Sequence, residues 1–276
     1  MKSNCKSREM AHFNGLRVNP LGFLKDDATL LKRLAIRFLL GRWDISLRHI
    51  PDEFLAGRTV LDACCGNPRI VCWMQSRGAE AFGCDLSINM LTMGNAGGYS
   101  YALGERVLLA PVRWTLADCE ELPFPDSAFD TVTCFQSLHH VDAGRFLEEC
   151  RRVLKPGGNL VISDPNGGHP LRKSANRLGR SLGLLSKDEG SMPPREVMAM
   201  LARHGFVIDK YRSINFLSEI VFLMEEILRE RRPALSALLR ASLLLFYPLD
   251  AVLDATLFRI FPRLAWRCIF IAEKRF

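Results

Sequence analysis

The chain has 276 residues, of which 48% are apolar and 24% charged, a composition that excludes wholesale disorder. This length suits one large domain with additions. The formal charge is +7 at pH 7 and the isoelectric point is near 9.0, which raises the question of binding to nucleic acid or to a membrane.

The charge is distributed unevenly along the chain. Residues 1–57 carry a net charge of +4, residues 58–165 a net charge of −4, and residues 166–276 a net charge of +7. The basic surplus therefore belongs to the flanks of an acidic centre. No helix-turn-helix, RNA-recognition or zinc-finger pattern is visible, and aromatic residues are not interleaved with the basic runs, so we expect no nucleic-acid partner.

The chain contains nine cysteines. The odd count and the polar start of the chain argue against a secreted disulfide scaffold and a targeting segment. No C-x-x-C pair occurs, and the adjacent pair Cys64 and Cys65 is poorly suited to share a zinc ion, so we expect no metal site. We interpret the cysteines as small hydrophobic residues of a protein in a reducing cytoplasm.

From residue 59 onward, short β-rich runs alternate with helical patterns, which predicts a parallel sheet covered by helices. Strands are predicted at residues 59–65, 80–85, 112–118, 129–135, 159–165, 205–214 and 265–274. Helices are predicted to begin at Asn67-Pro68, with Asn67 as the cap, and at Ser87, and to cover residues 143–154 and 194–204. Residues 155–158, Lys-Pro-Gly-Gly, are predicted to end the helix before them.

Two stretches depart from this alternation. Residues 166–192 are basic and Gly/Ser-rich and predict a loop with one short helix. Residues 216–262 are largely helical and apolar and are predicted to be split by Pro233 and Pro248. Their longest clean apolar run, residues 241–249, is less than half of the ~20 residues that a membrane span needs. We therefore expect an amphipathic helical insert.

Acidic residues end three successive predicted strands, where a doubly wound sheet binds its ligand. Asp62 precedes the first strand-to-helix turn with its Gly66, Asp85 lies about 20 residues after that turn, and Asp118 follows the third strand. Carboxylates in these places can accept hydrogen bonds from ribose hydroxyls and an adenine amine. Because residues 58–165 are acidic overall, a cationic sulfonium ligand is favoured over a pyrophosphate.

Four segments resemble the ordered motifs of class I S-adenosylmethionine-dependent methyltransferases, and their small-molecule branch in particular. They read VLDACCGNPRIVCWM, GCDLSINML, ADCEELPFPDSAFDTVTCFQSLHHV and LEECRRVLKPGGNLVISDP, and they cover roughly residues 58–165. The resemblance implies a Rossmann-like, doubly wound α/β sheet of seven strands in the order 3-2-1-4-5-7-6, with the last strand antiparallel. It also implies a methyltransferase domain over residues 58–276, preceded by a helical cap over residues 1–57.

The resemblance assigns roles to individual residues. Asp62 and Gly66 would hold the methionine portion of S-adenosylmethionine, Asp85 its ribose hydroxyls, and Asp118 with the Cys119 backbone its adenine. Gln136 would line the cofactor where the substrate approaches. The complete cofactor-binding set is Asp62, Cys64, Gly66, Asp85, Leu86, Asp118, Cys119 and Gln136.

The chain departs from the family at the first turn. The usual G-x-G-x-G reads Cys64-Cys65-Gly66-Asn67-Pro68, so two glycines are replaced. A non-catalytic relative that serves as an interaction or regulatory module is therefore an alternative to an active enzyme. A nicotinamide-dependent oxidoreductase is a further alternative, since such enzymes share the strand, the glycine turn and the acidic residue. It is remote because the chain lacks G-x-G-x-x-G.

Methyl transfer mainly requires alignment of the acceptor, and a base is needed only where the acceptor starts protonated. His139 and His140 follow the fourth strand and are our candidate catalytic residues; the alternative is that both pack or face solvent. The large additions, rich in Leu and Phe, predict a lid over a small hydrophobic substrate such as a lipid, quinone, polyketide or terpenoid-like molecule. Their arginine-bearing helices suit contact with an anionic membrane surface, and equally packing on each other or on a second subunit.

Overall fold

The computed structural model describes residues 46–47, 49–66, 68–93, 99–102, 105–108, 113–181, 190–228 and 232–275. Most of the predicted N-terminal cap, residues 1–57, lies outside the described residues. The part of it that is described contains the short 3-10 helix η1 (Asp52–Phe54), whose neighbours Ile50 and Leu55 are buried. This segment therefore packs on the domain that follows it.

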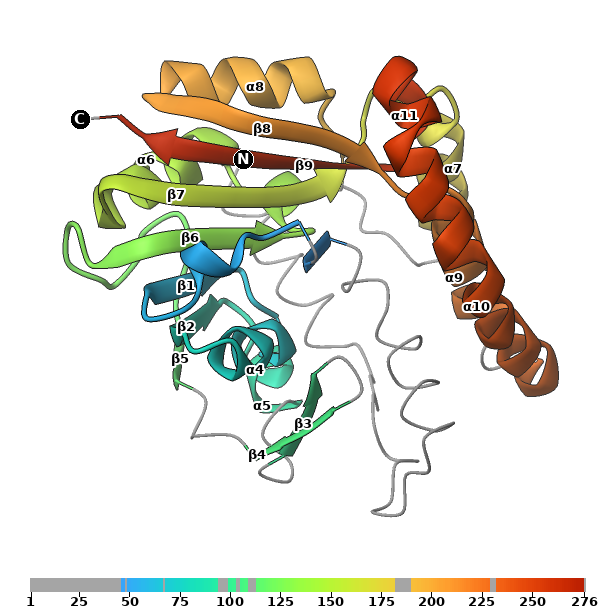
Figure 1. Ribbon diagram of the computed structural model, residues 1–276, viewed down its shortest axis with the longest axis horizontal. Coiled ribbons are helices and arrows are strands. Elements are labelled where there is room, and N and C mark those ends of the chain that lie inside the picture. The colour runs from blue at the N-terminus through green and yellow to red at the C-terminus, as the bar shows by residue number, and fades with distance from the viewer. Residues whose placement is uncertain are drawn as a thin grey trace.

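Seven strands form one twisted sheet in the order β5-β2-β1-β6-β7-β9-β8 (Figure 1). The strand β9 pairs antiparallel with both of its neighbours, and the other pairings are parallel. This is the predicted order 3-2-1-4-5-7-6 with an antiparallel last strand, so the expected Rossmann-like fold class is confirmed. The strands are β1 (Thr59–Ala63), β2 (Glu80–Asp85), β5 (Arg113–Leu116), β6 (Phe129–Phe135), β7 (Leu154–Pro165), β8 (Phe206–Ile214) and β9 (Arg267–Lys274).

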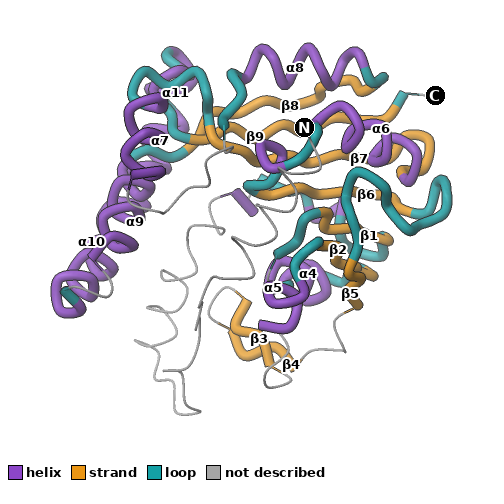
Figure 2. The backbone as a smooth tube through the Cα atoms, turned by 180° about the vertical axis from the view of Figure 1, so that it is seen from behind, coloured by secondary structure: helices purple, strands orange, loops and turns teal. Residues whose placement is uncertain are grey.

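Helices cover both faces of the sheet (Figure 2). On one face, α6 (Ala143–Val153) and α8 (Pro194–Arg203) contribute apolar side chains such as Phe146 and Leu201 to a core with Leu61 and Val132. On the other face, α4 (Arg69–Ser76) packs on alternate residues of the same strands, Val60 among them, together with Leu47, Ile50 and Leu55. Because both faces of the strands are buried, the strands read as nearly continuous apolar runs.

Two features of the first half differ from the prediction. A separate hairpin, β3 (Tyr99–Ala102) with β4 (Glu105–Leu108), follows α5 (Ile88–Met93) and was not expected. The helix α6 ends at Val153, before residues 155–158, as predicted, but the strand β7 already begins at Leu154 and not at residue 159. Residues 155–158 form a bulge between the pairs Phe129–Leu154 and Thr131–Asn159. A Cβ at Gly158 would lie 2.9 Å from Lys155 O, so the bulge requires glycine there.

The predicted insert forms a helical unit of α9 (Leu217–Leu228), α10 (Pro233–Ala255), α11 (Leu257–Ile260) and the 3-10 helix η3 (Pro262–Leu264). Pro233 opens α10 as predicted, but Pro248 lies inside α10 and does not split it. Two helical segments, Ala234–Leu243 and Leu245–Ile260, meet at a bend of 41°, and the second of them continues into α11. The bend falls four residues before Pro248, where the proline ring opposes the helical carbonyl.

No single helix of the described residues is long and apolar enough to cross a membrane. The two segments on either side of the bend reach the required length and apolar composition only when they are counted together.

Acidic residues hold the helical unit together and attach it to the sheet. Asp250 accepts hydrogen bonds from the backbone N–H groups of Leu217 and Ser218 at 2.9 Å each, and Asp254 accepts from that of Asn215 at 2.9 Å. At the same corner, Glu219 accepts two hydrogen bonds from the Arg267 guanidinium, at 2.6 and 2.9 Å, and both side chains are buried. Asp250 and Glu219 are therefore buried in the protein, whereas Asp254 is half-buried.

Candidate active site

The turn after β1 has a left-handed backbone. Cys64 has φ +56° and Gly66 has φ +52°, so two of the positions where the family usually has glycine need the region that glycine occupies most easily. Cys64 keeps this conformation although its Cβ opposes it. Asn67 lies outside the described residues. Pro68, the predicted first helical residue, is instead the N-cap of α4, which begins at Arg69, one residue later than predicted.

Asp85, at the end of β2, holds this turn in place. Its Oδ2 accepts from the Gly66 N–H at 2.7 Å, and its Oδ1 accepts from the Ser87 N–H at 2.8 Å. Burial raises the pKa of Asp85, and both N–H donors oppose that rise. A carboxylate has about four acceptor positions, so capacity is left for the two hydroxyls of a ribose. Leu86 follows and is half-buried.

Asp62, near the end of β1, is 1% exposed. Its Oδ1 accepts from the Thr133 hydroxyl at 2.7 Å, and its Oδ2 has no hydrogen-bond partner among the described residues. Burial raises the pKa of Asp62 to about 7, against the opposing effect of the Thr133 hydrogen bond. Such a carboxyl is suited to a cationic ligand, which would favour its ionised form.

The third acidic candidate follows β5. Asp118 Oδ1 accepts from the Glu120 N–H at 2.9 Å, which forms a tight turn. The next residue, Cys119, is buried, and its sulfur accepts from the Cys64 N–H at 3.0 Å. The loop after β5 is thereby connected to the turn after β1. The structure thus brings Cys64, Gly66, Asp85 and Cys119 together along one edge of the sheet.

Gln136 follows β6 and also has a left-handed backbone, with φ +58°. Its N–H donates to Ser163 O at 2.7 Å, and its side-chain Nε2 is buried with no partner in the described part of the chain. The hydroxyl of the next residue, Ser137, donates to Cys64 O at 3.3 Å. This hydrogen bond connects the turns after β1 and β6. Non-glycine residues in this strained region often mark functional sites.

The two candidate histidines lie on the 3-10 helix η2 (Leu138–His140). His139 Nδ1 lies 2.9 Å from Oδ1 of Asp164 at the end of β7, and the two side chains are 5% and 3% exposed. The ring of His140 lies against that of His139, with centroids 4.1 Å apart. Sequence reasoning missed Asp164. Its signal is an acidic residue near the carboxyl end of an otherwise apolar strand.

Three buried polar atoms at the ends of adjacent strands lack hydrogen-bond partners among the described residues. They are Asp62 Oδ2 on β1, Gln136 Nε2 after β6 and Asp164 Oδ2 on β7. Native proteins rarely leave such atoms unsatisfied, so these three can take a polar ligand or water at this edge of the sheet. Carboxylate acceptors and an amide donor fit the hydroxyls, amine and positive charge of S-adenosylmethionine.

The sheet and this edge together define the class of the protein: a Rossmann-like α/β protein with a nucleoside-binding edge. Residues 61–162 match the model of a family described as a methyltransferase domain. Residues 61–162 therefore form a methyltransferase domain, which agrees with the S-adenosylmethionine-dependent methyltransferase motifs of this segment.

Curated relatives resemble part of the chain. Methyltransferase GfsG of Streptomyces halstedii is 35% identical over 40% of this chain and 38% of its own length. A ubiquinone biosynthesis O-methyltransferase of Alkalilimnicola ehrlichii is 37% identical over 41% of this chain and 43% of its own length. The 27-O-demethylrifamycin SV methyltransferase of Amycolatopsis mediterranei is 33% identical over 40% of this chain and 39% of its own length. The aligned part of the chain thus spans about two fifths of each relative.

Solved structures share the fold over a longer stretch. Geranyl diphosphate C-methyltransferase from Streptomyces coelicolor matches with a TM-score of 0.61 at 16% identity, over 98% of both chains. The [4+2]-cyclase SpnF matches with a TM-score of 0.57 at 20% identity, over 98% of this chain and 92% of its own. At these identities the likeness concerns the fold alone.

Proposed function

We propose that this chain binds S-adenosylmethionine and transfers its methyl group to a small, apolar acceptor molecule. The observation that carries the proposal is the set of buried, unpartnered polar atoms of Asp62, Gln136 and Asp164 at the ligand edge of a methyltransferase-family sheet. The relatives named for polyketide-derived and quinone substrates support an acceptor of that class.

Each residue of the edge would do one task. Asp62 would pair with the positively charged methionine portion, Asp85 would accept from the ribose hydroxyls, and Asp118 with the Cys119 N–H would bind the adenine. Gly66 lets the backbone approach the ligand closely. Cys64, Leu86 and Gln136 would line the space between cofactor and acceptor. When bound, the sulfonium supplies an activated methyl group, so the protein mainly aligns the acceptor and excludes water.

His139 is the residue that we propose as the base for an acceptor that starts protonated. A carboxylate only accepts hydrogen bonds, so an ionised Asp164 fixes the proton of His139 on Nδ1. The lone pair then lies on Nε2, where it can take the proton of an acceptor hydroxyl. Stacking of His140 on His139 restricts the orientation of the ring, so we propose His140 as a positioning residue.

The helical additions would form the lid. The helix α7 (Arg172–Ser181) follows the carboxyl end of β7, and α9 follows that of β8. Since β7 and β8 run in the same direction, both additions start from the edge that carries Asp62 and Asp164. We therefore propose residues 58–276 as the catalytic unit, with residues 166–192 and 216–262 as its lid and residues 1–57 as a cap.

The test is titration of the full chain with S-adenosylmethionine and with S-adenosylhomocysteine by calorimetry, followed by turnover assays. Formation of S-adenosylhomocysteine would be measured with a panel of quinols, polyketide alcohols and isoprenoids. We expect cofactor binding that Asp85→Ala weakens by roughly 10- to 100-fold, since charge-assisted hydrogen bonds contribute about 1.5–3 kcal/mol each. Absence of binding to either compound would refute the proposal.

One observation favours a second candidate, a non-catalytic module: Cys64 carries a side chain into a backbone region suited to glycine. Replacing Cys64 and Pro68 together with Gly distinguishes the two functions. An active enzyme should change little in cofactor affinity, whereas a scaffold that has lost binding through these residues should gain it.

A further inference from the structure

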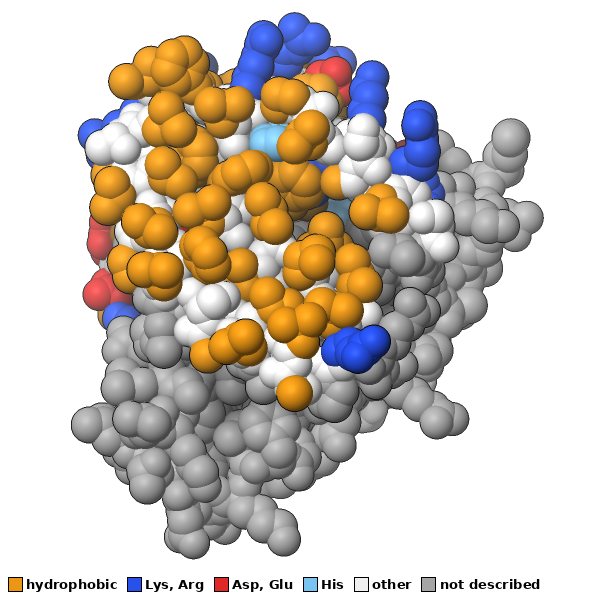
Figure 3. Space-filling view, turned by 90° about the vertical axis from the view of Figure 1, so that its right-hand side faces the viewer, with side chains coloured by type: hydrophobic (Ala, Val, Ile, Leu, Met, Phe, Trp, Pro, Cys, Tyr) orange, Lys and Arg blue, Asp and Glu red, His pale blue; other side chains and the backbone are white. Residues whose placement is uncertain are grey.

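One face of the helical unit and of α7 is covered by exposed apolar side chains (Figure 3). On α10, Leu238, Leu245 and Val252 are exposed at spacings of seven residues, which places them along one stripe of the helix. Leu238 is 66% exposed, and Ile260 on α11 is 71% exposed. Figures 1 and 2 both place α7, which exposes Leu178, beside these helices. We call this surface the apolar face.

The exposed charges described on these helices have one sign. The acidic side chains described on the helical unit are drawn inward: Glu219, Glu225 and Asp250 are buried, and Asp254 is half-buried against Asn215. The exposed charged side chains described on α7 and on the helical unit are all cationic: Lys173, Arg177, Arg180, Arg232, Arg259 and Arg263. In Figure 3, cationic side chains lie along the top and right of the apolar face, and acidic side chains lie at its left edge.

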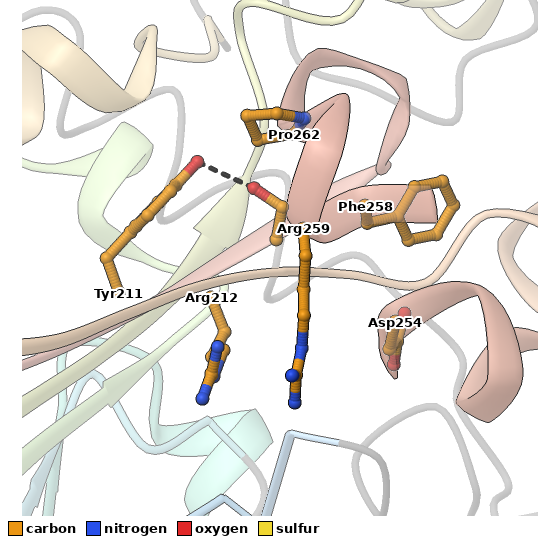
Figure 4. Close-up of a pocket in the computed structure, with 7 residues that line it drawn as sticks. Tyr211, Arg212, Asp254, Phe258, Arg259 and Pro262 are labelled. Carbon is orange, nitrogen blue, oxygen red and sulfur yellow. Dashed lines mark hydrogen bonds between the residues drawn. The ribbon is translucent and has the colours of Figure 1, made fainter. Parts of the chain in front are cut away.

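A pocket of about 330 Å³ opens at the edge of this unit, between the end of β8 and α11 (Figure 4). Arg212 of β8 and Arg259 of α11 both line it and extend in the same direction in the figure. Tyr211 and Ser213, whose hydroxyl oxygens are 2.6 Å apart, form another part of its wall. In Figure 4 the two guanidinium groups extend away from the Tyr211 hydroxyl, and Asp254, which accepts from the Asn215 N–H, also lines the pocket. Two guanidinium groups that extend side by side are suited to bind a phosphate group.

We propose that the apolar face docks on an anionic lipid bilayer and that the pocket between Arg212 and Arg259 receives a lipid phosphate. The chemistry of both parts agrees with this occupant, because an interfacial helix combines an apolar side with cations that attract anionic headgroups. Pairing with a second copy fits less well. In a twofold dimer the same surface meets itself, so the cations around this face would lie opposite one another.

The experiment is co-sedimentation of the full chain with vesicles of phosphatidylcholine alone and of phosphatidylcholine with phosphatidylglycerol. Two double variants test the two parts of the face: Val252→Ser with Ile260→Ser, and Arg259→Glu with Arg263→Glu. Matched controls lie elsewhere: Leu116→Ser on β5, where Leu116 is 51% exposed, and Arg195→Glu on α8. Circular dichroism would establish that each variant is folded.

We expect binding to the anionic vesicles, little binding to the neutral ones, and a loss of at least roughly tenfold in either double variant, since the contact combines apolar burial with electrostatic attraction. The controls should bind like the unmodified chain, and salt should weaken binding. Equal binding to both kinds of vesicle, binding to neither, or unchanged binding of the double variants would overturn the proposal. A dimer in light scattering that the Val252→Ser, Ile260→Ser variant dissociates, without vesicle binding, would assign the face to a second copy and overturn it too.

Discussion

His139 Nδ1 and Asp164 Oδ1 lie 2.9 Å apart inside the protein, although 25 residues separate them in the chain. The pair forms because His139 follows β6 and Asp164 lies near the end of β7, and the two strands are parallel neighbours. Both side chains are almost fully buried, so solvent does not compete for the hydrogen bond. A histidine oriented in this way is a better candidate base than an exposed one.

The first prediction concerns this pair. Asp164→Asn preserves the shape of the side chain but no longer fixes the proton on Nδ1. With the acceptor that the turnover panel identifies, we expect kcat to fall by roughly 10²-fold, within the usual contribution of acid–base catalysis. Cofactor affinity should be measured by calorimetry as well, because Asp164 Oδ2 is one of the unpartnered atoms at the ligand edge. A loss of turnover that exceeds the loss of affinity would assign Asp164 a role through His139.

A double-variant cycle provides the control. If the two residues act as a unit, His139→Gln combined with Asp164→Asn should lose no more activity than His139→Gln alone. Fully additive losses would show that Asp164 acts independently of His139, and normal turnover by Asp164→Asn would remove it from the mechanism.

The strand order and most strand boundaries could be predicted because local signals agree with the tertiary fold. Residues 80–85 and 129–135 were predicted to the residue, since polar or turn-forming segments surround apolar runs. Ser87 caps α5 as predicted, with its hydroxyl accepting from the Met90 N–H at 3.3 Å. The hairpin of β3 and β4 was missed, because strands of four residues are too short to show a clear period.

Other features depend on contacts that local patterns do not contain. Pro248 predicts a break, but α10 continues because it packs along α9, and the proline only bends it. The sequence pattern places Asp164 only near the end of a strand, because its partner His139 lies 25 residues away in the chain. The polar atoms of Asp62 and Gln136 are buried without partners because the tertiary fold buries the ends of their strands, and a local sequence pattern does not show this. The candidate set itself came from a resemblance, and its roles stay predictions.

The second prediction uses the raised pKa of Asp62. In the folded protein its pKa is about 7, above the ordinary value of 3.8, so folding favours the protonated form. The resulting stability is fully present below about pH 4 and is lost as the pH rises through 7. Compared with Asp62→Asn, the unmodified chain should therefore lose up to roughly 4 kcal/mol of unfolding free energy between pH 4 and pH 8. Urea denaturation over this range measures the difference.

The same group predicts the pH dependence of cofactor binding. A cationic ligand favours ionised Asp62, so binding near pH 6.5 should release a proton, and affinity should rise with pH until Asp62 is ionised. Calorimetry in two buffers of different ionisation enthalpy detects the proton. Asp62→Asn should abolish its release; proton release of the same size in that variant would assign it to another group.

The third prediction concerns the attachment of the helical unit. Glu219→Gln leaves the buried Arg267 without a compensating charge, and we expect it to cost about 3–5 kcal/mol of unfolding free energy. Replacing both residues with Met removes both buried charges and should restore most of that loss. Urea denaturation of the single and the double variant measures the effect. A single variant as stable as the unmodified chain would show that the pair does not stabilise the fold.

The last prediction separates backbone strain from side-chain packing at the first turn. Cys64→Gly and Cys64→Ala both remove the sulfur, but only Gly relieves the Cβ from its left-handed conformation at φ +56°. The left-handed region costs an L-residue about 1–2 kcal/mol, and the greater freedom of unfolded glycine offsets about 0.5–1 kcal/mol of this. Cys64→Gly should therefore be more stable than Cys64→Ala by about 0.5–1 kcal/mol in urea denaturation. If Cys64→Ala is the more stable, the turn is not strained at this residue, and the side chain of Cys64 is tolerated for its packing alone.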